Sequence, residues 1–292
     1  MERSVTKVVM LESRSVRQAC GQSANLARRK SGSRPPRTPV ESPDRTLACR
    51  HELKYHITET QAAAIAEFVK PFVQLDRYCK LQPSRDYPIV SLYLDSGDLE
   101  LCRESLTGHK NRFKLRIRSY TDEPEYPRFF EIKRRMNTII MKSRARVMDS
   151  DVETLLAGLP LPPQNYTADM DAINQFQLYV SNIRAKPAVL VRYMRQAYEG
   201  DDQNRVRVTF DRELAYNITK VAQVRSGGRG WQRSPFTMGG VILEIKFTDR
   251  YPAWLSRLVK HFNLRQRSIS KYASSLQDSS SLEFCAPELV TY

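Results

Sequence analysis

Charged and apolar residues alternate strictly in the segment RFKLRIR, residues 112–118. Cations occupy the even positions from Arg112 to Arg118, and apolar residues fill the odd positions. Because the side chains of a β-strand point alternately to opposite faces, the segment predicts a strand with one basic and one apolar face. Neighbouring cations on such a face lie roughly 7 Å apart, and each pair repels by about 0.6 kcal/mol in water. An anion would relieve this repulsion, although a solvated sheet face is the commoner explanation for one isolated strand.

The same division of faces recurs in other predicted strands. RVRVTFD places Arg205 and Arg207 on one face, and YMRQAY places Tyr193 beside Arg195. Any one of these cations is more often a surface residue or half of a cross-strand ion pair. Their recurrence on five strands instead predicts a barrel whose charged faces line a water-filled tunnel, because charges at strand centres are costly without water or a charged partner. A Glu-x-Lys pair with apolar neighbours occurs three times: Glu52 with Lys54, Glu131 with Lys133, and Glu244 with Lys246.

The rest of the pattern predicts a mostly β chain with few helices. Thr58 and Gln61 form a capping box that opens a helix, and Pro71 closes it. We therefore expect an α+β fold, mainly antiparallel β, with a closed eight-stranded β tunnel and helices packed outside. Strands are predicted at 49–57, 87–96, 111–120, 127–135, 138–148, 187–198, 205–213 and 239–248, and further helices at 97–106, 150–158, 169–183 and 252–262.

The composition limits the classes of function. Lys and Arg outnumber Asp and Glu by 47 to 32, which gives a formal charge of +15 and suits a phosphate-bearing partner. The five cysteines are scattered without a CxxC pair, so neither a zinc site nor a disulfide framework is indicated, and a reducing cytoplasm fits. No stretch approaches the roughly 18 apolar residues that span a bilayer. We expect a cytoplasmic protein without a membrane span.

The chain divides into three parts. Residues 1–48 are rich in Arg, Ser and Pro and poor in large apolar residues, so they are predicted to be a disordered basic leader. A transit peptide is an alternative, against which the Pro cluster and four acidic residues argue, and an over-extended start codon would look the same. One globular domain is expected at 49–278, followed by a tail at 279–292.

Nine motifs, spread over roughly residues 48–275, together resemble the VTC-type polyphosphate polymerase domain, a branch of the triphosphate tunnel (CYTH-like) superfamily. The resemblance implies an antiparallel β tunnel that moves the γ-phosphate of ATP onto inorganic polyphosphate or pyrophosphate, with Mn²⁺ or Mg²⁺ as a helper. Residues 1–48 leave no room for the SPX domain and membrane helices of eukaryotic polymerases, so a stand-alone bacterial version is expected. The motifs are, in order, RHELKY, SLYLDS, KLRIRSY, FFEIKRR, MKSRARV, VRYMRQAY, RVRVTFDREL, VILEIKF and SISKY.

The resemblance also assigns roles to single residues. It implies that Tyr193 and Ser270 contact the substrate and that Glu244 binds the metal. Arg205 and Lys114 are weaker substrate-binding candidates, because they share the parity of the basic face, as Arg112 also does. The catalytic phosphate-binding cations are expected to be Lys54, Arg116, Arg118, Lys133, Lys142, Arg195, Arg207 and Lys271.

Three other functions stay open. A tunnel triphosphatase would use the same lining, but such hydrolases usually begin with Glu-x-Glu-x-Lys, and Arg50 stands in the first Glu position. A catalytically silent protein would bind polyphosphate or nucleotide without turnover. A binder of single-stranded nucleic acid needs aromatic rings beside its cations. Because Phe113 lies on the apolar face of RFKLRIR, we expect no nucleic-acid partner.

Overall fold

One antiparallel sheet organises the chain. The computed structural model describes residues 50–137, 139–162, 169–200, 206–235, 240–248 and 251–279. The strands follow the order β1-β10-β8-β7-β3-β4-β5-β6, with β2 beside β7 and β9 beside β8. They are β1 (Arg50–Thr58), β2 (Gln74–Leu75), β3 (Tyr87–Asp95), β4 (Asn111–Ser119), β5 (Arg128–Met136), β6 (Ile139–Val147), β7 (Lys186–Glu199), β8 (Val206–Ile218), β9 (Gln232–Arg233) and β10 (Gly240–Thr248).

Helices connect and cover the strands. The predicted capping box is confirmed, because the Thr58 hydroxyl accepts from the Gln61 N–H at 3.1 Å and the Thr58 N–H donates to the Gln61 side chain at 3.0 Å. The α-helices are α2 (Glu59–Val69), α3 (Arg77–Lys80), α4 (Glu100–Leu106), α5 (Val152–Leu156), α6 (Met170–Asn182), α7 (Ala253–His261) and α8 (Lys271–Asp278), and a 3₁₀ helix spans Asp149–Asp151.

The mainly antiparallel β architecture is confirmed, but the closed eight-stranded barrel is wrong in two respects. The described residues form ten strands, because the short β2 and β9 add to the predicted eight. The sheet is also open, since no described residue of β1 pairs with β6. The segment after α7 lies along the other edge of β1, where Tyr55 bridges to Gln266 and the Arg267 N–H donates to the Lys54 carbonyl at 2.9 Å. This segment therefore occupies the edge of β1 with which β6 would have to pair to close the barrel.

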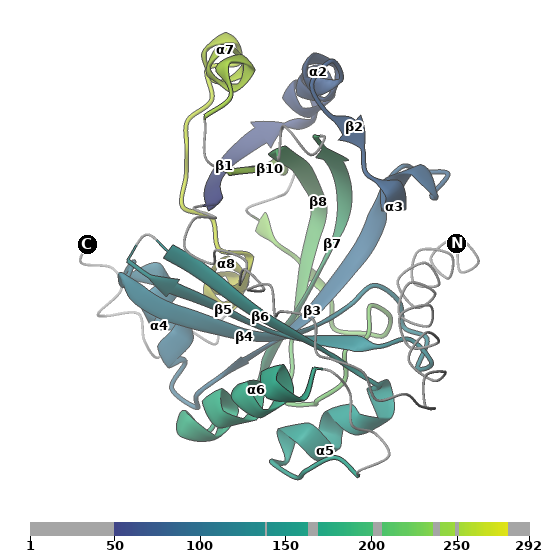
Figure 1. Ribbon diagram of the computed structural model, residues 1–292, viewed down its shortest axis with the longest axis vertical. Helices are drawn as coiled ribbons and strands as arrows, with labels where there is room; N and C mark the ends of the chain where they lie inside the picture. Colours follow the sequence, from purple (N-terminus) through teal and green to yellow (C-terminus); the bar gives the residue numbers. More distant parts are fainter. Residues whose placement is uncertain are drawn as a thin grey trace, which may run out of the picture.

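The apolar positions of RFKLRIR face outward, as the alternation predicts. Leu115 and Ile117 are fully buried and belong to an apolar cluster with Phe130 of β5 and Phe176 of α6. A second cluster buries the outer faces of β1, β8 and β10 under α2 and α7. Figure 1 shows α2 and α7 at one end of the molecule and α5 and α6 at the other. Burial of each such side chain stabilises the fold by about 1.5–3 kcal/mol.

Helix α8 corrects the expectation that all helices pack outside. Its residues Tyr272, Ala273 and Leu276 join the apolar cluster on the inner faces of β3 and β7, and α8 lies between the two ends of the molecule in Figure 1. The Ser270 hydroxyl caps the helix by accepting from the Ala273 N–H at 3.2 Å. The Tyr272 hydroxyl donates to Asp95 at the end of β3. Part of the interior is thus filled by a helix, and the charged side chains line the remainder.

Strand β8 continues beyond its predicted end at residue 213. Glu213 adopts a left-handed backbone conformation with φ 55°. After it, Leu214 and Tyr216 belong to the inner cluster, so the inward-facing positions change from odd to even. An irregularity of this kind inserts one residue into the alternation. A strand assignment based on alternation therefore stops where the period breaks.

Several predictions concern residues that the structure does not describe. The leader at 1–48, all of the tail except Ser279, and Arg205 lie outside the described residues. Within the described part of the chain, no helix has both the length and the apolar character needed to cross a bilayer.

The outer cluster can be tested by truncation. We expect Leu115→Ala to lower the free energy of unfolding by about 2–5 kcal/mol, because Leu115 is 0% exposed and the substitution leaves a cavity. Leu178→Ala on α6 is the matched control, since Leu178 is 58% exposed and its change should stay within about 0.5 kcal/mol. Denaturant unfolding measures both variants. Equal losses would contradict the assignment of odd positions to the core.

Candidate functional site

The inner face of the sheet encloses a cavity of about 970 Å³. Its lining comes from β1, β3 to β8, β10, and the segment that leads into α8. The described lining contains fourteen Lys or Arg residues and three Glu residues. Such an excess of positive charge in a confined, partly desolvated space produces a strong field that attracts a polyanion.

Twelve of the thirteen predicted site residues line this one cavity, although they come from eight separate elements. The thirteenth, Arg205, lies outside the described residues. Their shared location is a structural finding, whereas the role of each in binding stays a prediction. The twelve are Lys54, Lys114, Arg116, Arg118, Lys133, Lys142, Tyr193, Arg195, Arg207, Glu244, Ser270 and Lys271.

Glu131 at the centre of β5 holds three arginines of the lining. Arg116 Nε donates to Glu131 Oε2 at 2.6 Å, and Arg144 and Arg118 approach the same carboxylate at 3.5 and 3.9 Å. Burial would raise the pKa of Glu131, but Arg116 and Arg118 outweigh it and lower the pKa to about 2. The three guanidinium groups are thus oriented by a permanent negative charge before any ligand binds. Arg144 was not predicted, although it shares the alternation of Lys142 in MKSRARV.

Asp211 of β8 anchors a second group of cations in the lining. Arg195 donates two hydrogen bonds to its carboxylate, at 2.6 and 2.7 Å, and Lys271 Nζ lies 2.6 Å from it. Burial opposes ionisation of Asp211, yet Arg195 and Lys271 lower its pKa to about 2. The ring of Tyr193 lies 5.3 Å from the Arg195 guanidinium and 4.9 Å from Lys271 Nζ, within cation–π range. Sequence reasoning missed Asp211, although its odd position in RVRVTFD matches that of Arg207.

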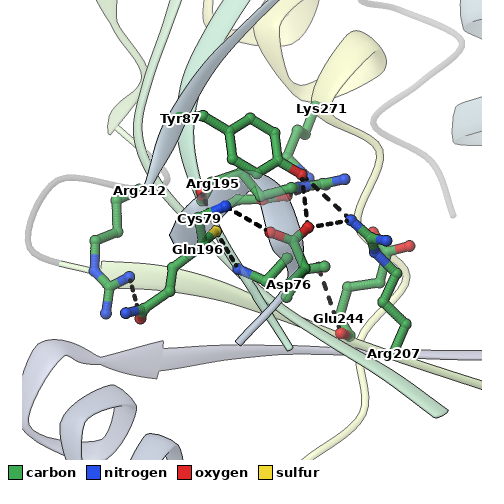
Figure 2. Close-up of polar contacts among 12 residues, drawn as sticks. Asp76, Cys79, Tyr87, Arg195, Gln196, Arg207, Arg212, Glu244 and Lys271 are labelled. Atoms are coloured by element: carbon green, nitrogen blue, oxygen red, sulfur yellow. Dashed lines mark hydrogen bonds and ion pairs between the residues drawn. The ribbon is translucent and has the colours of Figure 1, made fainter. Parts of the chain in front are cut away.

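Arg207 is held by residues from outside the cavity lining. Asp76 caps α3 by accepting from the Cys79 N–H at 2.7 Å, and its other carboxylate oxygen accepts from Arg207 Nη2 at 3.1 Å. The Tyr87 hydroxyl lies 3.2 Å from the same nitrogen, and Glu199 forms an ion pair with Arg207. Figure 2 shows Asp76 between Cys79, Tyr87 and Arg207. No pattern in the sequence indicated Asp76, because short α3 and β2 were not predicted.

Glu244, the predicted metal ligand, is buried on β10 and forms an ion pair with Lys246. Burial would raise its pKa, but Lys246 and Lys54 lower it well below the usual range. Among the described residues, no group of three or more His, Cys, Asp and Glu side chains could hold a metal alone. One ionised carboxylate does suit Mg²⁺ or Mn²⁺, which commonly take one or two carboxylates together with substrate phosphates. The residues therefore fit a metal that arrives with a phosphate ligand.

Two lining lysines have no acidic partner among the described residues. Lys114 Nζ donates to the Ser270 hydroxyl at 2.6 Å, and no carboxylate of the described residues lies within ion-pairing distance of Lys114 or Lys142. Burial and the surrounding cations lower the pKa of Lys114 to about 7 and that of Lys142 to about 8. Lys114 is therefore only partly charged near neutral pH, and Lys142 loses its charge just above neutral pH.

Comparisons with known proteins place this geometry in a family. The model of the VTC domain matches residues 49–279. The PH1819 protein from Pyrococcus horikoshii OT3 is 12% identical, with coverage of 78% of this chain and 100% of that chain and a TM-score of 0.39. The putative adenylyl cyclase HpAC1 from Hippeastrum, described as having a dominant triphosphatase activity, is 13% identical, with coverage of 77% and 94% and a TM-score of 0.42. Curated proteins gave no match. Because the family match extends over residues 49–279 of 292, the chain belongs to the VTC domain family.

Proposed function

We propose that the protein transfers the γ-phosphate of ATP onto the end of an inorganic polyphosphate chain inside the cavity. The observation that carries this proposal is the lining itself, where fourteen cations converge with three glutamates in about 970 Å³. Both substrates and both products are polyanions of repeated phosphate units, which such a lining would neutralise along their length. Membership of the VTC domain family supports the same reaction class.

The anchored cations would supply positioning. In-line phosphoryl transfer depends mainly on alignment of the two oxygens and on neutralisation of charge. Arg195 and Lys271 are oriented by Asp211, and Arg116 is oriented by Glu131, so little reorganisation would be needed when a triphosphate enters. Their side chains would stabilise the charge that moves onto the leaving β-phosphate.

The reaction would need no strong general base. The attacking terminal phosphate is already an oxyanion at neutral pH, and the described lining contains no histidine. A divalent ion bound at Glu244, either Mn²⁺ or Mg²⁺, would supply further charge neutralisation between neighbouring phosphates. The protein's own contribution at that point is the ionised carboxylate of Glu244, whose charge is maintained by Lys246 and Lys54.

The direct test separates the polymerase from its two rivals. Purified protein is incubated with ATP and Mn²⁺, with and without a short polyphosphate primer, and polyphosphate, ADP and free phosphate are measured separately. We expect polyphosphate chains on the gel with an equivalent amount of ADP. Free phosphate without chains would indicate a triphosphatase, and nucleotide binding without any product would indicate a silent binding protein. Either result would contradict the proposal.

A single substitution tests the metal site. We expect Glu244→Gln to abolish metal-dependent turnover and to leave ATP affinity within about tenfold of wild type, because many other cations still hold the phosphates. Glu67→Gln on α2 is the matched control, since the Glu67 side chain is 70% exposed, pairs among the described residues only with Lys70 and lies outside the cavity lining, so this variant should retain turnover. Steady-state kinetics at several Mn²⁺ concentrations measure both. Unchanged metal dependence in the Glu244→Gln variant would remove Glu244 from the site.

A further inference from the structure

The cations of β4, β5 and β6 form transverse rows across the inner face of the sheet. In the central row, Glu131 of β5 pairs in register with Arg116 of β4 and with Arg144 of β6. A carboxylate therefore lies between two guanidinium groups, and the ion pairs at 2.6 and 3.5 Å follow from that register. The carboxylate offsets one of the two positive charges in this row.

The next row has no such carboxylate. Lys133 pairs in register with Lys114 on one side and Lys142 on the other, so three lysines lie side by side. One step further along β4 and β5, Arg112 pairs with Arg135. Like charges directly opposite one another destabilise a sheet. We call these five residues the cation ladder.

Within the described residues, Lys133 alone among the five has a carboxylate within ion-pairing distance, Glu52 of β1 at 3.0 Å. Lys114 donates to the Ser270 hydroxyl, and the two arginines of the ladder donate to neutral backbone carbonyls. All five line the cavity. In four of the five members, an incoming anion would therefore have no described carboxylate to displace.

The cation ladder runs from the interior of the cavity to the protein surface. Lys114 and Arg112 are half-buried, whereas Arg135, next to the turn between β5 and β6, is exposed. Free cations therefore continue from the interior of the cavity to the protein surface. A short triphosphate would be satisfied within the interior, but a long chain of phosphates could follow the whole ladder.

We propose that the cation ladder is a separate subsite for the inorganic polyphosphate chain, which it guides from the cavity toward the β5–β6 turn. The carboxylate-anchored cations around Glu131 and Asp211 would take the triphosphate of the nucleotide. This inference rests on the proposed function, because it divides one cavity between the two substrates of that reaction.

A second property of the ladder follows from its unpaired lysines. A polyanion favours the ammonium form, so it raises the lowered pKa values of Lys114 and Lys142, and binding takes up protons at about pH 8. The groups that face Lys114 are Ser270, the Tyr272 ring, Lys54, Lys133, Arg112 and Arg116. Those that face Lys142 are Lys246, Lys133, Glu52 and Arg116.

The outer end of the ladder gives the sharpest test. In the double variant Arg112→Gln/Arg135→Gln, long-chain polyphosphate should bind at least about tenfold more weakly, because two charge-assisted contacts are lost. ATP and tripolyphosphate should bind within about twofold of wild type. Lys110→Gln is the matched control, since Lys110 is an exposed cation near the same end but outside the cavity lining. Calorimetric titration measures each ligand, and thermal unfolding checks that the variants fold.

Three outcomes would overturn the subsite. They are unchanged long-chain binding in the double variant, equal weakening of all three ligands, and an equal loss in Lys110→Gln. Since these titrations need no turnover, they are independent of the activity assay. If the wild type makes no polyphosphate but the double variant selectively loses the long chain, the proposed function fails and the subsite stands. If the wild type binds none of the three ligands, both fail.

Proton uptake is the independent readout. Long-chain polyphosphate is titrated into wild type at about pH 8 in two buffers with different heats of ionisation, and the difference in apparent heat gives the number of protons bound. We expect net uptake in the wild type and less uptake in Lys114→Met. Binding without proton uptake would contradict the presence of Lys114 and Lys142 in the chain subsite.

Discussion

Repulsion among cations on the inner face is the constraint on which the rest of the structure depends. Glu131 and Asp211 each lie where several cations of that face converge. Removal of one partner from a buried ion pair typically costs about 3–5 kcal/mol, because it leaves an uncompensated charge. The carboxylates therefore stabilise the cavity, and their placement determines which cations are held by an ion pair and which are not.

The same constraint bears on the open sheet. Backbone hydrogen bonds between β1 and β6 would complete the barrel. Repulsion opposes this closure, because burial and the positive charge of Lys246 on β10, next to β1, already lower the pKa of Lys142 on β6. The segment after α7 instead pairs with β1, and the Lys133–Glu52 ion pair joins β5 to β1. An ion pair between side chains spans a wider gap than a backbone hydrogen bond. The interior can therefore stay wide enough for a hydrated polyanion.

Alternation within strands predicted the lining well, because a period of two assigns a face to each residue without knowledge of its partners. Twelve site residues from separate segments meet in one cavity for that reason. Features fixed by tertiary contacts were missed. Asp76 reaches Arg207 from a short helix that follows a two-residue strand, and α8 is a Ser-rich helix stabilised by burial of Tyr272 on the sheet. The cap at Ser270 and the spacing of Tyr272, Ala273 and Leu276 were the available signals for α8.

Cations held by a carboxylate and unpaired lysines contribute differently to the binding of an anion in this cavity. A guanidinium held by a carboxylate loses little freedom when a ligand arrives, so it orients a reacting group, but its net attraction is reduced by the charge that holds it. An unpaired lysine contributes more attraction and less orientation, and its pKa falls until an anion restores its charge. In the proposed reaction, orientation is needed where a bond breaks, and attraction is needed along a chain that must be retained between transfers. The register of β4, β5 and β6 separates the two by a single step along the strands.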